Sequence, residues 1–413
     1  MAAIQKVAVV GLGYIGLPTA TMFATHGVQV VGIDVNQQAI DTINQGRIHI
    51  VEPGLEQLVH AAVQQGRLRA TRTPEPAEAF LIAVPTPFKE NHQPDLSYIE
   101  QATQAIAPVL QKGNVVILES TSPVGATEQM LDWLQALRPD LRFAQPGDTD
   151  PEVHVAYCPE RVLPGQVIRE LVENDRIIGG ITPACAERAA AVYRTFVQGE
   201  LLITEARTAE MSKLTENAFR DVNIAFANEL SVICERLGID VWELIRLANH
   251  HPRVNILRPG AGVGGHCIAV DPWFIVSKTP EQARLIRTAR EINDAKPQWV
   301  IHQIDMALAQ IATAQPVVAV LGLAFKPDID DLRESPAMEI ATALAQRSDL
   351  QLLIVEPNID QLPAALQGQV LCTLEQALQQ ADLLACLVSH RQFQGIAKKI
   401  SSPQRLVDVV GLR

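Results

Sequence analysis

Cys267 is the residue whose surroundings most suggest covalent chemistry. It follows the glycines of the segment GVGGHCIAVDP, and Asp271 stands four residues further along. Glycines let a substrate approach the sulfur closely, and a nearby base or positive charge would make that sulfur a nucleophile. A lone cysteine is more often an inert, small apolar residue. The chemical interpretation therefore depends on partners elsewhere in the chain.

Lys213 and Asn217 offer such partners in the segment EMSKLTEN. Residues four apart lie on the same face of a helix, so the spacing predicts that a cation and an amide stand side by side. That pair suits an oxyanion that develops during a reaction. The alternative is a solvated helix face on which Lys213 pairs with Glu210 or Glu216.

Polar side chains also stand at the ends of three predicted strands. Glu160 and Arg161 in CPERVLPG stand at a strand end, where ligands of α/β proteins bind and where a glutamate could activate water. Thr86 in IAVPTP, and Thr121 and Ser122 in ESTSPVG, occupy similar positions. The alternatives are a helix cap or a surface ion pair for the glutamate, and helix caps for the hydroxyls.

The segment VAVVGLGYIGLP predicts a dinucleotide site. Gly11, Gly13 and Gly16 form the pattern GxGxxG between a strand and a helix, whose N-terminus offers N–H groups to phosphates. Asp34 ends the next strand, where its carboxylate can accept hydrogen bonds from ribose hydroxyls. The same charge repels a 2′-phosphate, so NAD is favoured over NADP. The alternative makes the glycines ordinary breaks between strand and helix, and Asp34 or Asn36 a helix cap.

The elements that must position these residues form a doubly wound α/β domain. Apolar, β-branched segments alternate with helical patterns through roughly the first 200 residues. The expected strands are 6–13, 28–35, 79–87, 114–122 and 154–160, and the expected helices include 97–110 and 127–137.

A change of pattern follows in residues 208–249, which lack proline and recur at helical spacing, with Gly238 expected to separate two helices. A helix of about 30 residues would span about 45 Å, so it would bridge domains or form a subunit interface. A further helix is expected at 281–314. Strands expected at 317–325, 350–357, 383–388 and 405–410 then indicate a second, truncated nucleotide-binding-type domain.

The composition excludes several classes of protein. The 413 residues are 47% hydrophobic and 19% charged, and the net charge of −12 argues against nucleic acid or an anionic membrane as a partner. Six scattered cysteines without metal-ligand spacing predict a reducing compartment and no metal. Residues 7–35 are apolar but interrupted by glycines and Pro18, so neither a signal peptide nor a membrane helix is expected. The predicted location is cytoplasmic.

Taken in order, the motifs resemble those of the UDP-glucose/UDP-N-acetylmannosamine dehydrogenase family along essentially the whole chain. They are GxGxxG with its acid, VPTP, STSPVG, CPE, EMSKLTENAFR, GGHCIAVDP and GLAFKPDIDDLRESPAMEI. The resemblance implies an N-terminal Rossmann NAD-binding domain at 1–205 and a central long-helix dimerisation region with the catalytic cysteine loop at 206–315. A C-terminal Rossmann-like UDP-sugar-binding domain is implied at 316–413.

The resemblance also implies roles for single residues. Cys267 would be the catalytic nucleophile, and Glu160 would direct water. Lys213, Asn217 and Asp271 would stabilise the oxyanion. The implied NAD contacts are Gly11, Gly13, Tyr14, Ile15, Gly16, Asp34, Thr86, Thr121 and Arg333, and Thr121 also belongs to the implied catalytic set. The implied UDP-sugar contacts are Glu160, Arg161, Lys213, Asn217, Arg220, Arg253, Gly264, His266, Phe325 and Lys326, of which Arg253 is expected to reach across a homodimer.

Two departures separate the chain from the UDP-glucose branch of this family. Pro164 stands where that branch usually has glutamate, and His266 where it usually has serine. CPERVLPG, HPRVNILRPG and GGHCIAVDPWF resemble the UDP-N-acetyl-D-mannosamine branch. The implied reaction is an NAD-dependent four-electron oxidation of that sugar at C6, through a thiohemiacetal and a thioester on Cys267, in bacterial surface-polysaccharide synthesis. UDP-N-acetylglucosamine and, less favoured, UDP-glucose are the alternative substrates.

Two other classes of protein compete with this interpretation. A β-hydroxyacid dehydrogenase shares the nucleotide-binding domain, the long helix and a helical lysine, but it performs one oxidation and leaves the second α/β domain unexplained. An NAD-sensing protein without activity would explain the glycines. It would not explain Cys267, Lys213 and Glu160 together.

Overall fold

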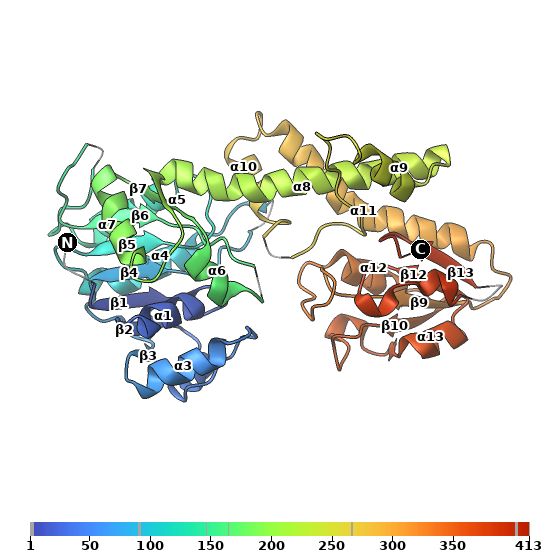
Figure 1. Cartoon of the computed structure of the whole chain (residues 1–413), viewed down its shortest axis with the longest axis horizontal. Helices are drawn as coiled ribbons and strands as arrows, with labels where there is room; N and C mark the ends of the chain where they lie inside the picture. The colour runs from blue at the N-terminus through green and yellow to red at the C-terminus, as the bar shows by residue number, and fades with distance from the viewer. Residues whose placement is uncertain are drawn as a thin grey trace. The chain divides into compact units, whose positions relative to one another are not determined.

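The computed structural model describes residues 4–89, 92–145, 147–163, 165–265, 267–400 and 404–412. The chain divides into two compact units, residues 1–215 and 216–413, and each unit holds one sheet covered by helices (Figure 1). Pro164 and His266 lie outside the described residues. No helix in the described part of the chain is long and apolar enough to cross a membrane.

The N-terminal unit is built on an eight-stranded sheet in the order β3-β2-β1-β4-β5-β6-β7-β8. The strands from β1 to β6 run parallel, and β7 pairs antiparallel with β6. The order reverses between β1 and β4, the point where such sheets bind ligands. The bounds are β1 Lys6–Val10, β2 Gln29–Ile33, β3 Leu68–Thr71, β4 Ala79–Ile82, β5 Val115–Leu118, β6 His154–Tyr157, β7 Arg176–Gly180 and β8 Leu201–Glu205.

Helices cover both faces of this sheet. Val7 and Val9 of β1 belong to the core under α1, α3, α6 and α7, whereas Ala8 and Val10 belong to the core under α4 and α5. This alternation explains why the strands are apolar without a break and confirms the doubly wound α/β prediction. The helices are α1 Gly16–Thr25, α2 Gln37–Asn44, α3 Leu55–Gln64, α4 Ser97–Ile106, α5 Ala126–Leu137, α6 Val167–Glu173 and α7 Pro183–Tyr193.

All five strands expected in this unit are present, but β3, β7 and β8 were not predicted from the sequence. β8 is an edge strand without a buried residue, so its sequence carries no core pattern. β7 begins with a buried arginine and ends in two glycines, which are uncommon in strand interiors.

The long helix expected from residue 208 is α8, which runs over Ala206–Leu237 for 32 residues and crosses the boundary between the units. Gly238 follows it with a φ of +67°, a left-handed conformation that favours glycine. Asp240 then caps the next helix, α9 Val241–Ala248. The predicted break at Gly238 is therefore confirmed.

The C-terminal unit adds a five-stranded parallel sheet in the order β11-β10-β9-β12-β13. Counted along the chain, this is the order of the first five strands of the larger sheet, which confirms a second, smaller domain of nucleotide-binding type. The bounds are α10 Asp271–Lys278, α11 Arg284–Leu308, β9 Val317–Leu321, α12 Pro336–Ala345, β10 Gln351–Val355, β11 Val370–Leu371, α13 Leu374–Gln380, β12 Leu383–Cys386 and β13 Arg405–Asp408.

Candidate functional site

Two glycines between β1 and the start of α1 are required by close packing of the backbone, without reference to a ligand. Gly11 has a φ of +90°, and a Cβ there would stand 2.4 Å from the Ala83 carbonyl oxygen. A Cβ on Gly16 would stand 1.8 Å from the Gly11 carbonyl oxygen. Any side chain at either position would force the loop away from β4 or the helix away from β1.

Gly13 is different, because a Cβ there would meet no atom within 4 Å. The fold does not require glycine at this exposed position, whereas a ligand that lies against the backbone would. The first turn of α1 carries neither a side-chain cap nor an acidic residue, so the positive end of the helix dipole meets no competing anion there. The Leu17 N–H donates to the Gly13 carbonyl oxygen at 3.1 Å, and Pro18 has no N–H. The open space at Gly13 and the positive helix end fit the pyrophosphate of a dinucleotide.

Asp34 directly follows β2 beside this loop and is half-buried. One carboxylate oxygen accepts from the Leu12 N–H at 2.8 Å, and the other accepts from the Asn36 N–H at 2.8 Å. Asn36, not Asp34, caps α2. The cap alternative therefore applies to Asn36 alone, and Asp34 presents a fixed, partly exposed carboxylate next to the glycine loop.

Thr86 and Thr121 follow β4 and β5, the strands beside β1. The Thr86 hydroxyl donates to the Thr121 carbonyl oxygen at 2.7 Å, which joins the two loops. The structure thus brings together two residues that the sequence placed only at separate strand ends.

Neither Thr121 nor Ser122 caps the next helix, α5. The Ser122 hydroxyl donates to the Ser120 carbonyl oxygen at 2.8 Å. Glu210 of α8 instead accepts from the α5 N-terminus: from the backbone N–H of Gly125 at 2.7 Å and, at Thr127, from the N–H at 2.8 Å and the hydroxyl at 2.6 Å. The helix-cap alternative for the two hydroxyls is wrong.

Glu160 is buried with 8% of its surface exposed. One oxygen accepts from the Arg161 N–H at 2.7 Å, and the other lies 3.2 Å from the Arg176 guanidinium. Glu160 is thus held in one orientation by a buried ion pair, not by a surface pair or a helix cap. Arg161 is half-buried, and its guanidinium donates to the Asp175 carbonyl oxygen.

Sequence reasoning missed the residues that pack behind Glu160. Arg176 lies in β7, Glu119 follows β5 directly, and Tyr193 ends α7; all three are buried. The available signal was a charged residue adjoining an otherwise apolar strand, in RIIGG and in VVILE.

Lys213 is buried on α8 and makes no hydrogen bond or ion pair with a described residue. The alternative in which Lys213 pairs with Glu210 is wrong, because the Glu210 carboxylate is engaged with α5. Asn217 follows one helical turn later. The predicted cation and amide therefore stand on one face of α8.

Asn217 contacts Asp271, as its side-chain N–H donates to the buried Asp271 carboxylate at 2.5 Å. Asp271 is the first residue of α10, and its backbone N–H donates to the Cys267 carbonyl oxygen at 2.9 Å. Cys267 is exposed. In the C-terminal unit, the structure thus joins the backbone at Cys267 to Asp271, whose buried carboxylate holds the Asn217 amide.

The glycines before Cys267 let its loop lie flat on another segment of the C-terminal unit. A Cβ on Gly264 would stand 2.8 Å from the Phe325 Cβ, and a Cβ on Gly265 would stand 2.8 Å from the Phe325 ring. The Gly265 N–H also donates to the Arg333 carbonyl oxygen at 3.2 Å. The cysteine loop and the loop after β9 are therefore one packed structure.

The remaining predicted contacts are exposed cations. Lys326, Arg220, Arg253 and Arg333 all point to solvent, and Arg333 forms an ion pair with Asp331. In the described residues, no group of three or more His, Cys, Asp or Glu side chains is placed to hold a metal ion.

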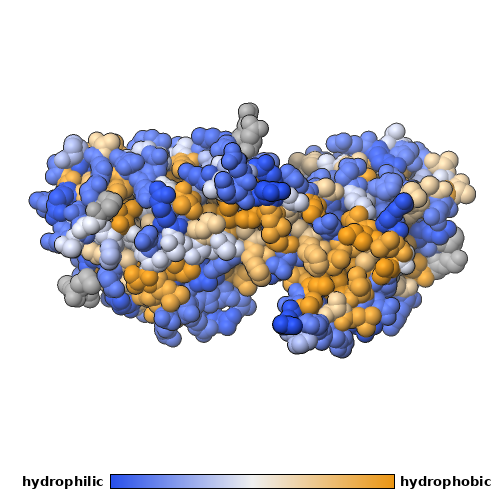
Figure 2. Space-filling view, turned by 90° about the horizontal axis from the view of Figure 1, so that it is seen from above, coloured by the Kyte–Doolittle hydropathy of each residue, from blue (hydrophilic) through white to orange (hydrophobic). Residues whose placement is uncertain are grey.

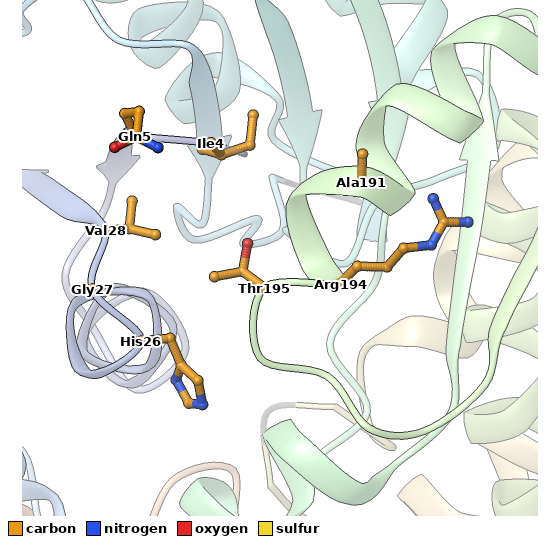
Figure 3. Close-up of a pocket in the computed structure, with 8 residues that line it drawn as sticks. All are labelled: Ile4, Gln5, His26, Gly27, Val28, Ala191, Arg194 and Thr195. Atoms are coloured by element: carbon orange, nitrogen blue, oxygen red, sulfur yellow. The ribbon is translucent and has the colours of Figure 1, made fainter. Parts of the chain in front are cut away.

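A cleft in the N-terminal unit lies away from these residues (Figure 3). It opens beside the residues that precede β1 and β2, at the amino-terminal ends of these strands. The glycine loop lies at their carboxyl-terminal ends. Ligands of parallel sheets bind at the carboxyl ends of the strands, so this cleft is not the dinucleotide site. Its lining consists of Ile4, Gln5, His26, Gly27, Val28, Ala191, Arg194 and Thr195.

Comparison with known proteins agrees with this arrangement. Three models of the UDP-glucose/GDP-mannose dehydrogenase family match the chain: the NAD binding domain at 5–197, the central domain at 207–295 and the UDP binding domain at 319–412. The chain is 61% identical to a UDP-N-acetyl-D-mannosamine dehydrogenase of Escherichia coli, over 98% of both chains. It is 62% identical to an NDP-N-acetyl-D-galactosaminuronic acid dehydrogenase of Ralstonia nicotianae, over 99% of this chain and 96% of that protein.

The fold resembles solved structures of the same kind. A structure of a UDP-D-ManNAc dehydrogenase from Pyrococcus horikoshii superimposes with a TM-score of 0.88 at 38% identity, over 99% of this chain and 96% of that one. The chain therefore belongs to the UDP-glucose/GDP-mannose dehydrogenase family, and it is an NAD-dependent UDP-sugar dehydrogenase.

Proposed function

We propose that the enzyme oxidises UDP-N-acetyl-D-mannosamine at C6 to UDP-N-acetyl-D-mannosaminuronate. The observation that carries this proposal is the identity of about 60%, over the full length, to proteins named for that substrate. The departures at Pro164, four residues after Glu160, and at His266, directly before Cys267, support a 2-acetamido sugar. Loss of the carboxylate at position 164 makes the pocket less polar, which suits an N-acetyl group better than a hydroxyl.

The chemistry proceeds in two oxidations and one hydrolysis. NAD supplies the hydride acceptor, and two molecules of it are consumed for each sugar. The first oxidation converts the C6 alcohol to an aldehyde, and the Cys267 thiolate adds to that carbonyl to form a thiohemiacetal. The second oxidation converts the thiohemiacetal to a thioester, and water then releases the acid and the thiol. The covalent bond keeps the aldehyde from escaping between the two oxidations.

Four polar residues have roles in this scheme. Lys213, a buried cation without an ion-pair partner among the described residues, stabilises the thiohemiacetal oxyanion together with Asn217. Asp271 orients the Asn217 amide through their hydrogen bond. Glu160, held in one orientation, directs the hydrolytic water.

The UDP moiety binds in the C-terminal domain. Lys326 follows β9 and provides an exposed cation for a phosphate, and Phe325 and Gly264 support the loop that carries it. Arg220 and Arg253 add positive charge in a chain whose net charge is −12. These local cations are required because the overall charge repels a nucleotide sugar.

The enzyme acts as a homodimer through α8. Three exposed apolar residues recur on this helix every seven positions: Phe219, Phe226 and Ile233, with 71%, 53% and 44% of their surfaces exposed. Seven-residue spacing aligns them along one face, as in helices that pack against helices. Figure 2 shows hydrophobic surface gathered on the C-terminal unit in the view from above.

A competition assay tests the substrate. The enzyme is incubated with excess NAD and an equimolar mixture of UDP-N-acetyl-D-mannosamine, UDP-N-acetyl-D-galactosamine, UDP-N-acetylglucosamine and UDP-glucose, and the acids are separated and counted against NADH. The expected result is dominant mannosaminuronate with two NADH per acid. Dominant galactosaminuronate would instead support the activity for which the Ralstonia nicotianae relative is named. Dominant glucuronate would refute a 2-acetamido substrate.

The variant Cys267→Ser is the matched chemical control for this assay. A serine hydroxyl is a far weaker nucleophile than a thiolate at neutral pH, so release of acid should fall by about 10³-fold or more. Acid formation by this variant at the wild-type rate would refute the covalent scheme while leaving the substrate result intact.

A further inference from the structure

A closed cluster of ionisable groups lies behind Glu160 in the N-terminal domain. Its members are Arg176 on β7, Glu119 after β5, Tyr193 on α7 and Cys158 after β6, and all of them are buried. None of these four has a role in the reaction described above.

Arg176 is the only cation of this cluster. Its guanidinium lies 3.2 Å from a Glu160 oxygen and 4.8 Å from the centre of the Tyr193 ring. The Phe196 ring centre is 5.8 Å away, and the Leu171 carbonyl oxygen lies 3.5 Å from a guanidinium nitrogen. The guanidinium is therefore fixed between Glu160 and an aromatic wall.

Glu119 is the second carboxyl near this guanidinium. One oxygen accepts from the Tyr193 hydroxyl at 2.6 Å, and the other is buried without a hydrogen-bond partner in the described residues. Burial raises the pKa of Glu119 to about 7; the Arg176 charge opposes that rise, and the Glu160 charge adds to it. Glu119 therefore changes its charge near neutral pH.

The other two groups stay neutral in that range. Burial raises the pKa of the Cys158 thiol to about 12 and raises the pKa of the Tyr193 hydroxyl well above its ordinary value. When Glu119 ionises, the cluster and Glu160 together hold two carboxylates and one guanidinium, and no other group of the cluster compensates the extra charge.

We propose that Glu119 is a positioning residue that tunes the hydrolytic step through Arg176, by competing with Glu160 for the single buried guanidinium. Ionised Glu119 repels the Glu160 carboxylate and takes part of its counter-charge, so Glu160 accepts the proton of the hydrolytic water more readily. Neutral Glu119 leaves the guanidinium to Glu160, which is then the weaker base. This inference rests on the proposed role of Glu160.

The test follows thioester hydrolysis in a single turnover, with the UDP-sugar that forms acid in the competition assay. Enzyme, sugar and excess NAD are mixed and quenched, and the fraction of protein that carries the adduct is measured by intact mass between pH 5.5 and 8.5. The wild-type hydrolysis rate should rise roughly three- to tenfold, with a midpoint near pH 7. Glu119→Gln should keep the low rate at every pH, because the amide imitates the neutral carboxyl.

Tyr193→Phe provides the second variant. It removes the hydroxyl that stabilises ionised Glu119, so the midpoint should move to higher pH without being lost. Glu210→Gln is the matched control, since it alters another buried carboxyl of the same domain that lies outside the cluster, and its midpoint should stay at the wild-type position. A wild-type profile in Glu119→Gln, or an unmoved midpoint in Tyr193→Phe, would overturn the proposal.

Glu160→Gln separates this inference from the mechanism on which it rests. If Glu160 directs the water, this variant accumulates the adduct at every pH. If no adduct accumulates, the role of Glu160 itself fails, whatever the Glu119 variants show. An adduct in Glu160→Gln combined with a wild-type profile in Glu119→Gln would refute only the role of Glu119.

Discussion

Asp34 and Glu356 occupy the same position in the two domains, but Asp34 is partly exposed whereas Glu356 is buried. Each directly follows the second strand of its sheet and accepts an N–H from the loop after the first strand, Leu12 at 2.8 Å and Leu323 at 2.7 Å. Glu356 is also bonded to buried His390 at 3.0 Å. Burial alone would raise the pKa of Glu356, but the hydrogen bonds from His390 and the loop hold it below its ordinary value. Only the half-exposed Asp34 remains able to bind a ribose.

Asp34→Asn should reduce the discrimination between NAD and NADP. The amide keeps an oxygen that can accept a backbone N–H, but it loses the charge that repels a 2′-phosphate and binds the ribose hydroxyls strongly. We expect the ratio of kcat/KM for NAD to that for NADP to fall by about tenfold or more. Asn36→Ala, which removes only the α2 cap, should leave the ratio unchanged. An unchanged ratio in Asp34→Asn would show that this carboxylate does not contact the ribose.

At the scale of single residues, the sequence provided candidates for contact with a ligand but did not indicate the residues that pack behind them. The segments of Cys267, Lys213 and Asn217 made these residues candidates, and their expected roles came from the resemblance to a family. The sequence does not indicate the partners of Glu160, because Arg176 is 16 residues away and lies in β7. Which buried charge faces which carboxyl depends on strand order, and no local pattern carries that information.

Among the elements, α5 depends on a residue of a distant helix for its cap. Glu210 on α8 accepts three hydrogen bonds at the α5 N-terminus, 83 to 85 residues away in the chain. This contact fixes the start of α8 to the helix that follows the Thr121 loop. The length of α8 could be predicted from its proline-free periodicity, but the cap could not, because Gly125 at the N-cap position has no side chain to signal it.

Glu210→Ala should loosen α5 from its N-terminus. The variant leaves two backbone N–H groups and the Thr127 hydroxyl without their acceptor in a buried site, which costs about 2 kcal/mol. Amide hydrogen exchange in the first turns of α5 should then be roughly 30-fold faster. Glu128→Ala is the control on the same helix: its pairing with Arg207 is exposed, and its loss should change exchange by a few-fold at most. Equal effects in both variants would show that Glu210 does not cap α5.

The whole molecule repeats one architecture at two sizes, and the sequence predicted both because each sheet is buried on its two faces. Unbroken apolar segments such as VVAVL in β9 predict central strands. The exposed edge strand β8 has no such segment, so its sequence does not predict a strand. The proposal that Cys267, Lys213 and Glu160 act in one active site comes only from the resemblance to a family. Composition and periodicity do not indicate which loops lie close to one another in the folded chain.

An active site shared between the two subunits of a dimer can be tested by mixing two inactive variants, whereas neither variant alone provides this test. If Arg253 reaches the sugar bound by the partner subunit, then Arg253→Ala and Cys267→Ser each inactivate every site of their own homodimers. In a mixed dimer, one site combines the intact Cys267 of one chain with the intact Arg253 of the other, and the second site lacks both.

Denaturing and refolding the two inactive variants together should therefore restore activity. Random pairing makes half of the dimers mixed, each with one working site, so about a quarter of the wild-type activity should return. Adding Phe226→Glu to both variants places a charge on the exposed apolar face of α8 and should abolish both the recovery and the dimer mass seen by light scattering. Val51→Glu, at an even more exposed apolar position of the N-terminal domain, should leave both intact. No recovery from a mixture that does form dimers would mean that Arg253 acts within its own chain.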